Sequence, residues 1–457
     1  MIAAKKKKRS YRKPAAAKVE NLVLGLGVTG LSVARYLQRN GVNARFVDSR
    51  SEPPGLDELN DLAPDAEVIL GASRDAALEN INRIVVSPGI ADSEPLLIAA
   101  RAAGIEIVSD IELFAREARA AIVAVTGSNG KSTVTTLLSL MCDAAGQTAL
   151  AGANLGEPAL DLLEYDKPDF YVLELSSFQL QRTQKLPAKV AVLLNITADH
   201  LDWHESEKSY RKAKYRIFKN ADAAVINRAD PDIAKHVGKE TVVVSFGLDA
   251  PEEGHYGLLE EDGIEFLARG QQLLLATSEL ALVGRHNQLN ALAALAAGDL
   301  MGLALSAMLQ VLPEFPGLPH RMQLVACKGG VNYINDSKAT NIGAAVASIE
   351  SIDGIIVLIA GGEAKGGDFN HLSVALTDRL RAAILIGSDA DKIAQALEDQ
   401  APVHIVNDIN EAVEHAASFA QSGDTVLLAP ACASFDQFPN FQVRGDAFGE
   451  AVLSLPR

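Results

Sequence analysis

A glycine-rich turn followed by a lysine and two hydroxyl residues is the stretch whose residue types most clearly indicate chemistry. Residues 121–136 read AIVAVTGSNGKSTVTT, an apolar run typical of a strand, then a turn, then a helical pattern. The N–H groups of such a turn and the positive end of the following helix bind phosphate. Lys131 adds positive charge near the β- and γ-phosphates, and the Ser132 hydroxyl can reach Mg²⁺. Because Val125 replaces the first glycine of the standard P-loop, the motif is a shortened relative of that loop.

This motif predicts which residues surround a nucleotide triphosphate. The alternative is an ordinary strand–turn–helix unit with a surface lysine, but the strand before the turn and the helix after it favour a nucleotide site. The predicted phosphate cradle consists of Gly127, Ser128, Asn129, Gly130, Lys131, Ser132 and Thr133.

A second glycine-rich turn lies near the N-terminus. Residues 19–50 predict a strand, the turn GLGVTG, a helix over 31–39 and another strand that ends in Asp48-Ser49-Arg50. A GxGxxG turn with an acidic residue about 20 positions later is the fingerprint of dinucleotide binding and, taken alone, suggests NAD. Arg50 beside Asp48 could equally bind a phosphate. The strand 83–86 ends in the turn SPGI, which contains Gly89 and is expected to lie over the same ligand.

Length, charge and cysteine content bound the class of protein. A chain of 457 residues predicts two to four domains. The net charge of −16 argues against general nucleic-acid binding, although local basic sites could still hold small anions. The three cysteines, Cys142, Cys327 and Cys432, are far apart, which fits a reducing cytosol and provides neither a disulfide framework nor zinc spacing.

Two stretches could suggest a membrane or nucleic-acid partner. The basic start of the chain, residues 1–18, has no apolar segment of signal-peptide length, and a solvated, disordered extension is favoured over a nucleic-acid or membrane arm. The apolar stretch 291–312 is interrupted by Asp299 and two glycines, which favours a packed helix over a membrane span.

The strand and helix pattern predicts an α/β fold of three domains. After the tail, we expect a Rossmann-like unit over residues 19–109, a central P-loop-type unit over 110–316 and a second Rossmann-like unit over 317–457. Nearly all-apolar strands in the central unit, at 170–173 and 190–194, indicate a parallel sheet covered on both faces. Short alternating runs over 241–282 predict a small antiparallel addition, and the cluster PGLP at 316–319 predicts a hinge.

Several polar residues follow predicted strands. Glu174 ends an apolar strand of the unit that carries the phosphate motif, so it could hold Mg²⁺, although a helix-capping or surface acid is the alternative. His200 lies in the polar segment 195–202 after the next strand. A lone histidine is more often structural than a ligand, but its polar neighbours make the two interpretations about equal. Lys214 lies in the basic helix YRKAKYRIF, which alone predicts a solvated face and singles out no lysine.

The third unit carries a further group of polar residues, His320-Arg321, the run NDSKATN at 335–341, Lys365 in a glycine-rich turn, and Ser434. Each alone could cap a helix or form a turn. Together, at strand ends of one unit, they predict a second wall of a cleft that closes about the hinge and excludes water.

These motifs, taken in order, resemble the Mur ligase family. They are TGSNGKST, LELSSFQL, TADHLD, YRKAKYRIF, GRHNQLNALAA, GLPHRM, NDSKATN and APACASFDQF. The resemblance extends from about residue 19 to the C-terminus. DSKATN and ACASFDQF are most similar to the members that add D-glutamate, rather than to those that add alanine, meso-diaminopimelate or a dipeptide.

The resemblance implies a cytoplasmic step of peptidoglycan precursor synthesis, and hence a role in cell shape and division. ATP, with Mg²⁺, would phosphorylate the carboxylate of UDP-N-acetylmuramoyl-L-alanine. The amine of D-glutamate would then attack this acyl phosphate to give an amide, ADP and phosphate. Positioned cations would neutralise the converging anions. The resemblance implies no nucleic-acid or membrane partner, and we expect a monomer.

The resemblance also implies roles for individual residues. Lys131, His200 and Lys214 would be catalytic, and Lys214 would be the family's carbamylated lysine. Asn287, Arg321 and Asp336 would complete the ATP site. The metal ligands would be Ser132, Glu174, His200 and carbamylated Lys214. The UDP-linked substrate would contact Val28, Thr29, Ser49, Arg50, Gly89 and Asn154. D-Glutamate would contact Lys338, Thr340, Lys365, Ser434 and Phe441. Val28 and Phe435 differ from the apolar residues expected at their positions.

Three other functions are compatible with parts of the sequence. An NAD-dependent dehydrogenase would leave the second phosphate motif unexplained, and the resemblance assigns the GxGxxG turn to UDP instead. A non-catalytic nucleotide-binding regulator would not need Lys131 and Glu174, and both are present. A folylpolyglutamate synthase would share the ATP motif but is expected to lack the first unit.

Overall fold

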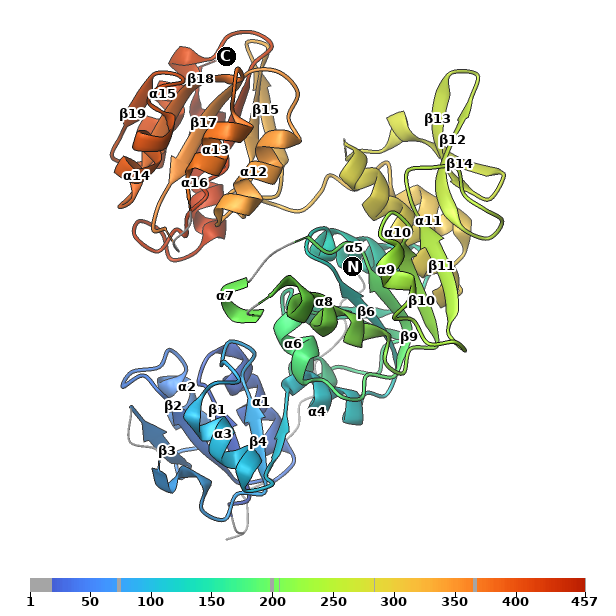
Figure 1. Ribbon diagram of the computed structural model, residues 1–457, viewed down its shortest axis with the longest axis vertical. Coiled ribbons are helices and arrows are strands. Elements are labelled where there is room, and N and C mark those ends of the chain that lie inside the picture. Colours follow the sequence, from blue (N-terminus) through green and yellow to red (C-terminus); the bar gives the residue numbers. More distant parts are fainter. Residues whose placement is uncertain are drawn as a thin grey trace. The chain divides into compact units, whose positions relative to one another are not determined.

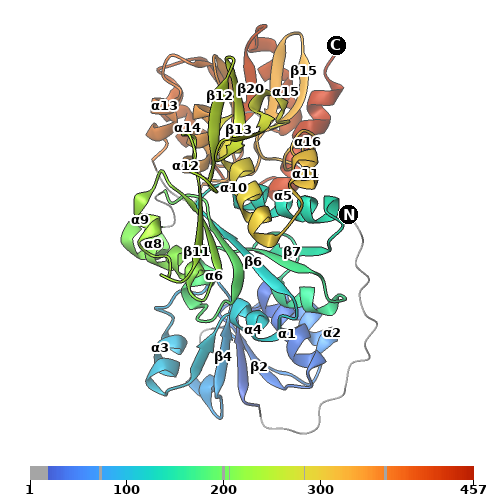
Figure 2. The same ribbon diagram turned by 90° about the vertical axis from the view of Figure 1, so that its right-hand side faces the viewer.

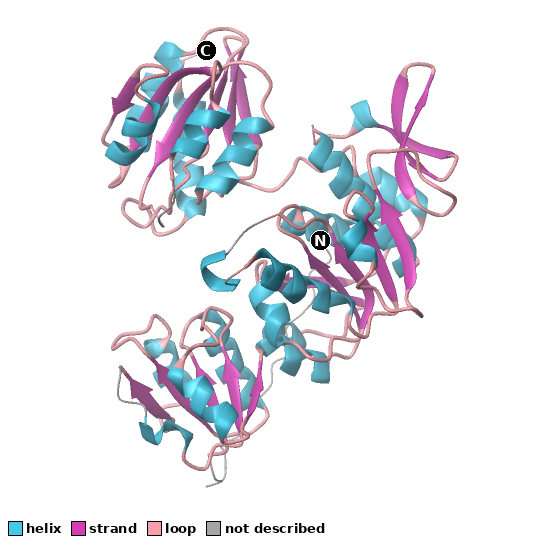
Figure 3. Ribbon diagram, in the orientation of Figure 1, coloured by secondary structure: helices cyan, strands magenta, loops and turns pink. Residues whose placement is uncertain are grey.

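The computed structural model describes residues 19–71, 75–197, 201–204, 206–282, 284–364 and 368–456. The predicted basic extension, His200 and Lys365 lie outside these ranges. The chain divides into two compact units, Met1–Phe315 and Pro316–Arg457, which are considered separately. In each unit, helices flank the sheets, as expected for an α/β fold (Figure 3).

The N-terminal part of the first unit is a five-stranded parallel sheet with the order β3-β2-β1-β4-β5. Its strands are β1 (Asn21–Leu24), β2 (Ala44–Asp48), β3 (Glu67–Leu70), β4 (Arg83–Val86) and β5 (Glu106–Val108). Its helices are α1 (Val28–Arg39), α2 (Leu56–Leu62), η1 (Asp75–Leu78) and α3 (Pro95–Ala102). The first helix starts at Val28, earlier than the predicted 31–39. Gly27 is extended and caps the helix, so the last three residues of the GLGVTG turn already belong to it.

A nine-stranded sheet forms the rest of the first unit, with the order β14-β13-β12-β11-β10-β9-β6-β8-β7. Six strands are parallel: β6 (Ala121–Thr126), β7 (Ala149–Ala153), β8 (Phe170–Glu174), β9 (Ala188–Leu193), β10 (Ala223–Asn227) and β11 (Val242–Phe246). The predicted antiparallel addition is β12 (Tyr256–Glu261), β13 (Ile264–Arg269) and β14 (Gln272–Ala276). It begins after β11, which still pairs in parallel with β10.

Helices and short turns cover this sheet. They are α4 (Asp110–Glu117), α5 (Lys131–Ala144), η2 (Ala159–Glu164), α6 (Ser177–Arg182), α7 (Leu201–His204), α8 (Glu207–Tyr215), η3 (Arg216–Phe218), α9 (Pro231–Ala234), η4 (Thr277–Glu279), α10 (Arg285–Met301) and α11 (Leu305–Val311). Helices α10 and α11 both pack against α5 (Figures 1 and 2). The single helix predicted over 291–312 is wrong, because Gly302, with φ 87°, ends α10 in a left-handed cap. Within the described ranges, no helix has both the length and the apolar character needed to cross a membrane.

The second unit is built on a six-stranded sheet with the order β15-β16-β20-β17-β18-β19, parallel except for the β15–β16 pair. The strands are β15 (Gln323–Lys328), β16 (Val331–Asn335), β17 (Ile356–Gly361), β18 (Leu380–Ile386), β19 (Val403–Ile405) and β20 (Thr425–Leu428). Alternate residues of β17 face opposite layers: Leu358 packs with α12 (Ile342–Glu350), α13 (Asn370–Ala375) and α14 (Ala390–Leu397). Val357 and Ile359 pack instead with α15 (Ile409–Phe419) and α16 (Phe441–Ser454).

Candidate active site

The predicted phosphate loop connects β6 to α5 and is held by the end of the neighbouring strand β9. The backbone N–H of Ser128 donates to the carbonyl of Asn195 (2.9 Å), and that of Asn129 donates to the Asn195 side-chain oxygen (2.8 Å). The Asn195 amide donates back to the Asn129 carbonyl (3.1 Å). Asn195 therefore fixes the shape of the loop, a role that the sequence did not assign to it.

Gly130, the last residue before α5, has φ 82° and closely approaches α10. A Cβ at this position would lie 2.3 Å from the side-chain oxygen of Asn290, so only glycine fits. Asn290 also donates to the side-chain oxygen of Asn287 (3.2 Å), the residue predicted to contact adenine. The start of α10 and the phosphate loop thus belong to one site.

Lys131 folds over its own loop. Its Nζ donates to the carbonyls of Gly127 (3.0 Å) and Ser128 (2.8 Å). Ser132 and Thr133 follow in the first turn of α5, where Ser132 is buried. A triphosphate oxygen is anionic and therefore a stronger hydrogen-bond acceptor than either carbonyl. We expect the Lys131 ammonium group to turn toward a bound nucleotide.

Lys214 is buried against the same loop. Only 2% of the residue is exposed, and its Nζ donates to the Gly127 carbonyl (2.7 Å) and lies 4.7 Å from the ring centre of Tyr210. The Tyr210 hydroxyl in turn bonds the Ser128 hydroxyl (2.9 Å). The prediction of a solvated basic face is therefore wrong for Lys214. The four-residue spacing from Tyr210, which places both on one helix face, is the signal that could have singled it out.

Glu174 ends β8 beside this loop and is nearly fully buried. One oxygen, Oε1, accepts from the Asn154 amide (2.5 Å), whereas the buried Oε2 has no hydrogen-bond partner in the described part of the chain. A buried carboxylate oxygen without a donor suits a hard divalent cation. Within the described ranges, no group of three or more His, Cys, Asp or Glu residues is arranged to hold a metal ion, and the predicted ligand His200 is outside these ranges.

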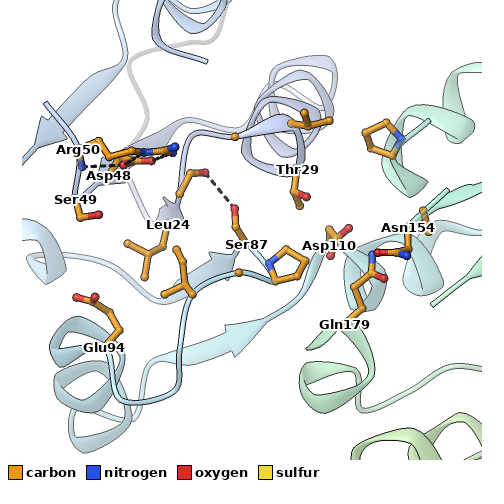
Figure 4. Close-up of a pocket in the computed structure, with 18 of the residues that line it drawn as sticks. Leu24, Thr29, Asp48, Ser49, Arg50, Ser87, Glu94, Asp110, Asn154 and Gln179 are labelled. Carbon is orange, nitrogen blue, oxygen red and sulfur yellow. Dashed lines mark hydrogen bonds and ion pairs between the residues drawn. The ribbon is translucent and has the colours of Figure 1, made fainter. Parts of the chain in front are cut away.

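A cavity of about 640 Å³ lies at the carboxyl ends of β1, β2 and β4 and extends to Asn154, directly after β7, and to Gln179 of α6 (Figure 4). All six residues predicted to contact the UDP-linked substrate line it: Val28, Thr29, Ser49, Arg50, Gly89 and Asn154. The Ser87 hydroxyl donates to the Gly25 carbonyl (3.2 Å) and joins the two loops over the cavity.

Asp48 organises the first glycine-rich turn. Its carboxylate accepts from the backbone N–H of Leu26 (2.7 Å) and from the Arg50 side chain (2.8 and 2.9 Å). Burial alone would raise the pKa of Asp48, but the hydrogen bonds from Arg50 and the Leu26 amide outweigh it and lower that pKa to about 2. The acidic residue of the fingerprint therefore holds the turn and Arg50, which faces the cavity with half of its side chain exposed.

Several of the residues predicted for the ATP and D-glutamate sites lie in the loops that follow β16 and β20 of the second unit, namely Asp336, Lys338, Thr340 and Ser434. Asp336 follows β16, is buried, and accepts from the Ser348 hydroxyl and the Met322 N–H. Burial raises its pKa, against the hydrogen bond from Ser348. Lys338 Nζ lies 4.2 Å from the ring centre of Phe441, the first residue of α16. Arg321, Thr340 and Ser434 occupy neighbouring turns of the same unit.

Arg444 connects these turns and was missed by sequence reasoning. It is 1% exposed, and its guanidinium donates to the Ser337 hydroxyl and carbonyl (both 3.0 Å). It also donates to the carbonyls of Gly361, Cys432 and Ala433. Burial lowers the pKa of Arg444 to about 10. The three loops that follow β16, β17 and β20 are thus tied to one buried cation, and no local pattern in FQVRGDAF marks it.

Comparison with known proteins places these features in a family context. Residues 19–109 match the model of the Mur ligase MurD-like N-terminal domain, 125–298 the Mur ligase middle domain, and 320–432 the Mur ligase glutamate ligase domain. A UDP-N-acetylmuramoylalanine–D-glutamate ligase of Nitrosococcus oceani is 49% identical over 95% of this chain and 96% of its own length. The ligase of the same name from Pseudomonas aeruginosa is 48% identical over 95% and 98%.

Solved structures show the same fold at low sequence identity. A UDP-N-acetylmuramate–alanine ligase from Thermotoga maritima is 19% identical with a TM-score of 0.59, over 96% of this chain and all of that one. A MurF ligase from the same organism in complex with ADP is 17% identical with a TM-score of 0.58, over 90% and 95%. The Escherichia coli FolC structure covers only 74% of this chain, with a TM-score of 0.54.

Proposed function

The chain belongs to the Mur ligase family, and we propose how its residues divide the work of the ligation. It is an ATP-dependent ligase that adds D-glutamate to UDP-N-acetylmuramoyl-L-alanine in peptidoglycan synthesis. The observation that carries this function is the identity of 45–49% to D-glutamate ligases over 95% of the chain. An NAD-dependent dehydrogenase is excluded by the same relatives.

Phosphoryl transfer would take place at the loop between β6 and α5. We assign the triphosphate to the N–H groups of residues 127–133 and to Lys131, with Asn287 at the adenine. The substrate carboxylate attacks the γ-phosphorus, the bond to the bridging oxygen breaks, and ADP leaves. Lys131 would stabilise the charge that develops, because its Nζ lies at the loop, where it donates to the carbonyls of Gly127 and Ser128.

Mg²⁺ fits the residues beside this loop. Glu174 would bind it through Oε2, which has no donor in the described part of the chain, and Ser132 would add its hydroxyl. His200 is proposed for a second ion. Bound Mg²⁺ would neutralise phosphate charge. For Lys214, we propose carbamylation, because its Nζ lies in a buried site next to Gly127 where an added carboxylate would face the same cations.

The first cavity would hold the UDP-linked substrate through Val28, Thr29, Ser49, Arg50, Gly89 and Asn154. D-Glutamate is assigned to the second unit, where Lys338 and Lys365 would pair its carboxylates and Thr340, Ser434 and Phe441 would fix its orientation. Arg321 and Asp336 would contact ribose and γ-phosphate. The attacking amine replaces phosphate at the acyl carbon and loses a proton as the amide forms. We further propose that the domains divide near residues 109 and 316, and that the protein works as a cytoplasmic monomer.

A phosphate-release assay tests this function. Purified protein with ATP, Mg²⁺ and UDP-N-acetylmuramoyl-L-alanine should release orthophosphate when D-glutamate is added. L-Glutamate, meso-diaminopimelate and L-lysine should give little or none. Mass spectrometry should find the amide product in the same reaction, and release without amide formation would contradict the ligase assignment.

A further inference from the structure

Arg182 is a buried arginine that the proposed function leaves without a role. It ends α6 in the central part of the first unit, and only 7% of its side chain is exposed. Its guanidinium donates to the carbonyls of Ser87 (3.3 Å) and Ile90, and to Asp92 Oδ1 (3.1 and 3.3 Å). All three acceptors lie on the segment 87–92 that follows β4 in the N-terminal sheet.

The segment 87–92 is one wall of the UDP-substrate cavity. Its first four residues, Ser87 to Ile90, line the cavity (Figure 4). The segment has no regular secondary structure beyond a turn, so its path depends on the donors that reach its carbonyls. Arg182 supplies donors to two of these carbonyls from outside the N-terminal sheet.

Gln181, the neighbour of Arg182, connects the segment 87–92 to helix α7. Its amide Nε2 donates to Asp92 Oδ2 (2.8 Å), and its Oε1 accepts from the indole N–H of Trp203 (3.3 Å). Trp203 lies on α7, directly after the segment that contains His200. At the other end of α6, Glu174 precedes the helix by only three residues. Only residues 175 and 176 therefore separate the proposed metal carboxylate, at the end of β8, from the helix whose last residue contacts the segment 87–92.

The charges make this contact specific. Burial lowers the pKa of Arg182, and Asp92 opposes that effect. Burial would raise the pKa of Asp92, but Arg182 and Arg101 outweigh it and lower that pKa. A buried guanidinium needs both its carboxylate and its carbonyl partners, because each group left without a partner loses its hydration without compensation.

Other ion pairs also join the five-stranded sheet to the nine-stranded sheet, so this junction does not depend on Arg182 alone. On another part of the junction, Arg35 of α1 donates to Asp161 of η2 (2.5 Å) and Arg39 pairs with Glu164. The ion pairs of these two arginines do not involve the segment 87–92. A variant of either arginine therefore tests the effect of a weaker junction between the two sheets without a change at the cavity wall.

We propose that Arg182 is a positioning residue for the UDP-linked substrate, which holds the segment 87–92 in the shape of the cavity wall and joins it, with Gln181, to α6. This role rests on the proposed function. Because α6 begins shortly after Glu174, the same contact sets where the bound substrate lies relative to the phosphate-transfer site.

Arg182→Met should raise the KM for UDP-N-acetylmuramoyl-L-alanine by roughly tenfold, as expected for loss of charge-assisted hydrogen bonds. The KM for ATP and for D-glutamate should stay within about twofold, and kcat should fall much less than the affinity for the UDP-linked substrate.

Two variants sharpen the test. Arg182→Lys keeps the pair with Asp92 but lacks the fork that reaches both carbonyls, so it should lie between wild type and Arg182→Met. Arg35→Gln removes an ion pair at the same junction and should leave the KM for the UDP-linked substrate unchanged. If Arg35→Gln and Arg182→Met raise this KM equally, general docking explains the effect and the positioning role is refuted.

Calorimetry with UDP-N-acetylmuramoyl-L-alanine alone separates this inference from the proposed function. No binding by the wild-type protein would count against the function itself. Wild-type binding together with equal affinity of Arg182→Met would overturn only the role of Arg182. Should Arg182→Met fail to fold, as seen by circular dichroism, Asp92→Asn weakens the same contact from the other side and should shift the same KM in the same direction, and an unchanged KM in that variant would refute the role.

Discussion

The side-chain amide of Asn154 donates a 2.5 Å hydrogen bond to Glu174 Oε1. Asn154 lines the UDP-substrate cavity, and Glu174 ends β8 beside the phosphate loop. The pairing of β7 with β8, in which Ala153 is opposite Glu174, makes this contact possible. In the proposed function, the carboxyl group of a substrate that extends from the cavity past Asn154 would lie next to the proposed metal site. The bond occupies only Oε1, and Oε2 of Glu174 has no hydrogen-bond partner in the described part of the chain, so it would be available to the proposed cation.

Replacement Glu174→Gln should weaken the binding of Mg²⁺ at this site. The amide removes the negative charge and can present an N–H₂ group to the ion. Loss of one carboxylate ligand is expected to raise the Mg²⁺ concentration for half-maximal phosphate release by about tenfold or more. A Mg²⁺ titration of the initial rate measures this shift. An unchanged titration curve would remove Glu174 from the metal site.

Lys131→Ala should abolish ATP-dependent turnover while the protein stays folded. The ammonium group donates to the loop carbonyls of Gly127 and Ser128, which are neutral acceptors, so we expect the fold to tolerate its removal. Loss of an electrostatic contact to the transferring group lowers kcat by roughly 10²-fold or more. Phosphate release and circular dichroism test the two parts of this expectation. Normal turnover by a folded variant contradicts the assignment of the loop.

Arg50→Ala should reduce affinity for the UDP-linked substrate more than affinity for ATP. The guanidinium is fixed by Asp48 and faces the cavity, where a diphosphate would accept its hydrogen bonds. Loss of such charge-assisted bonds corresponds to roughly 10- to 100-fold in affinity. Isothermal titration calorimetry with each ligand separately gives the comparison. Equal weakening of both ligands would indicate a general effect on the fold.

Asp110→Asn should stabilise the protein at neutral pH but not in acid. Burial raises the pKa of Asp110 from 3.8 to about 6, against hydrogen bonds from the backbone amides of residues 110 and 111. Well below pH 4 the carboxyl is protonated in both the folded and the unfolded state and does not affect stability. Between about pH 4 and 6 it is ionised in the unfolded chain but still protonated in the folded protein. The wild type therefore loses stability over this range, by roughly 3 kcal/mol at most, and above it the loss is constant.

Denaturant unfolding of Asp110→Asn and wild type between pH 4 and 8 measures this difference. The gap in free energy of unfolding should grow up to about pH 7 and then level off. The exposed position Asp65→Asn serves as control and should show no such trend. A gap that is constant with pH would mean that the effect arises from packing instead of ionisation.

Local pattern was sufficient for much of the fold. The strand β4 has the predicted bounds, 83–86, because an apolar run bounded by polar residues and a proline–glycine turn defines it. The stretch 291–312 was read as one helix, since its apolar composition continues across Gly302. The left-handed cap at that glycine depends on backbone geometry that composition does not report.

Buried cations were the least predictable part of the site. Lys214, Arg444 and Arg182 lie in sequences rich in polar residues, where a charged side chain is normally exposed. Lys214 donates to a carbonyl 87 residues away, and Arg182 donates to the Asp92 carboxylate 90 residues away. Arg444 donates to carbonyls only 11 and 12 residues away, but also to the Ser337 carbonyl 107 residues away. No short window of sequence contains the full set of acceptors of any of these cations, so these contacts emerge only from the folded chain.

The hydrophobic layers on the two faces of the second unit's sheet are both formed by residues of that unit. The residues of its two hydrophobic layers lie between Met322 and Leu455, on either side of a single sheet. We therefore expect a fragment that starts at residue 316 to fold without the preceding part of the chain, which would make it suitable for isotope labelling.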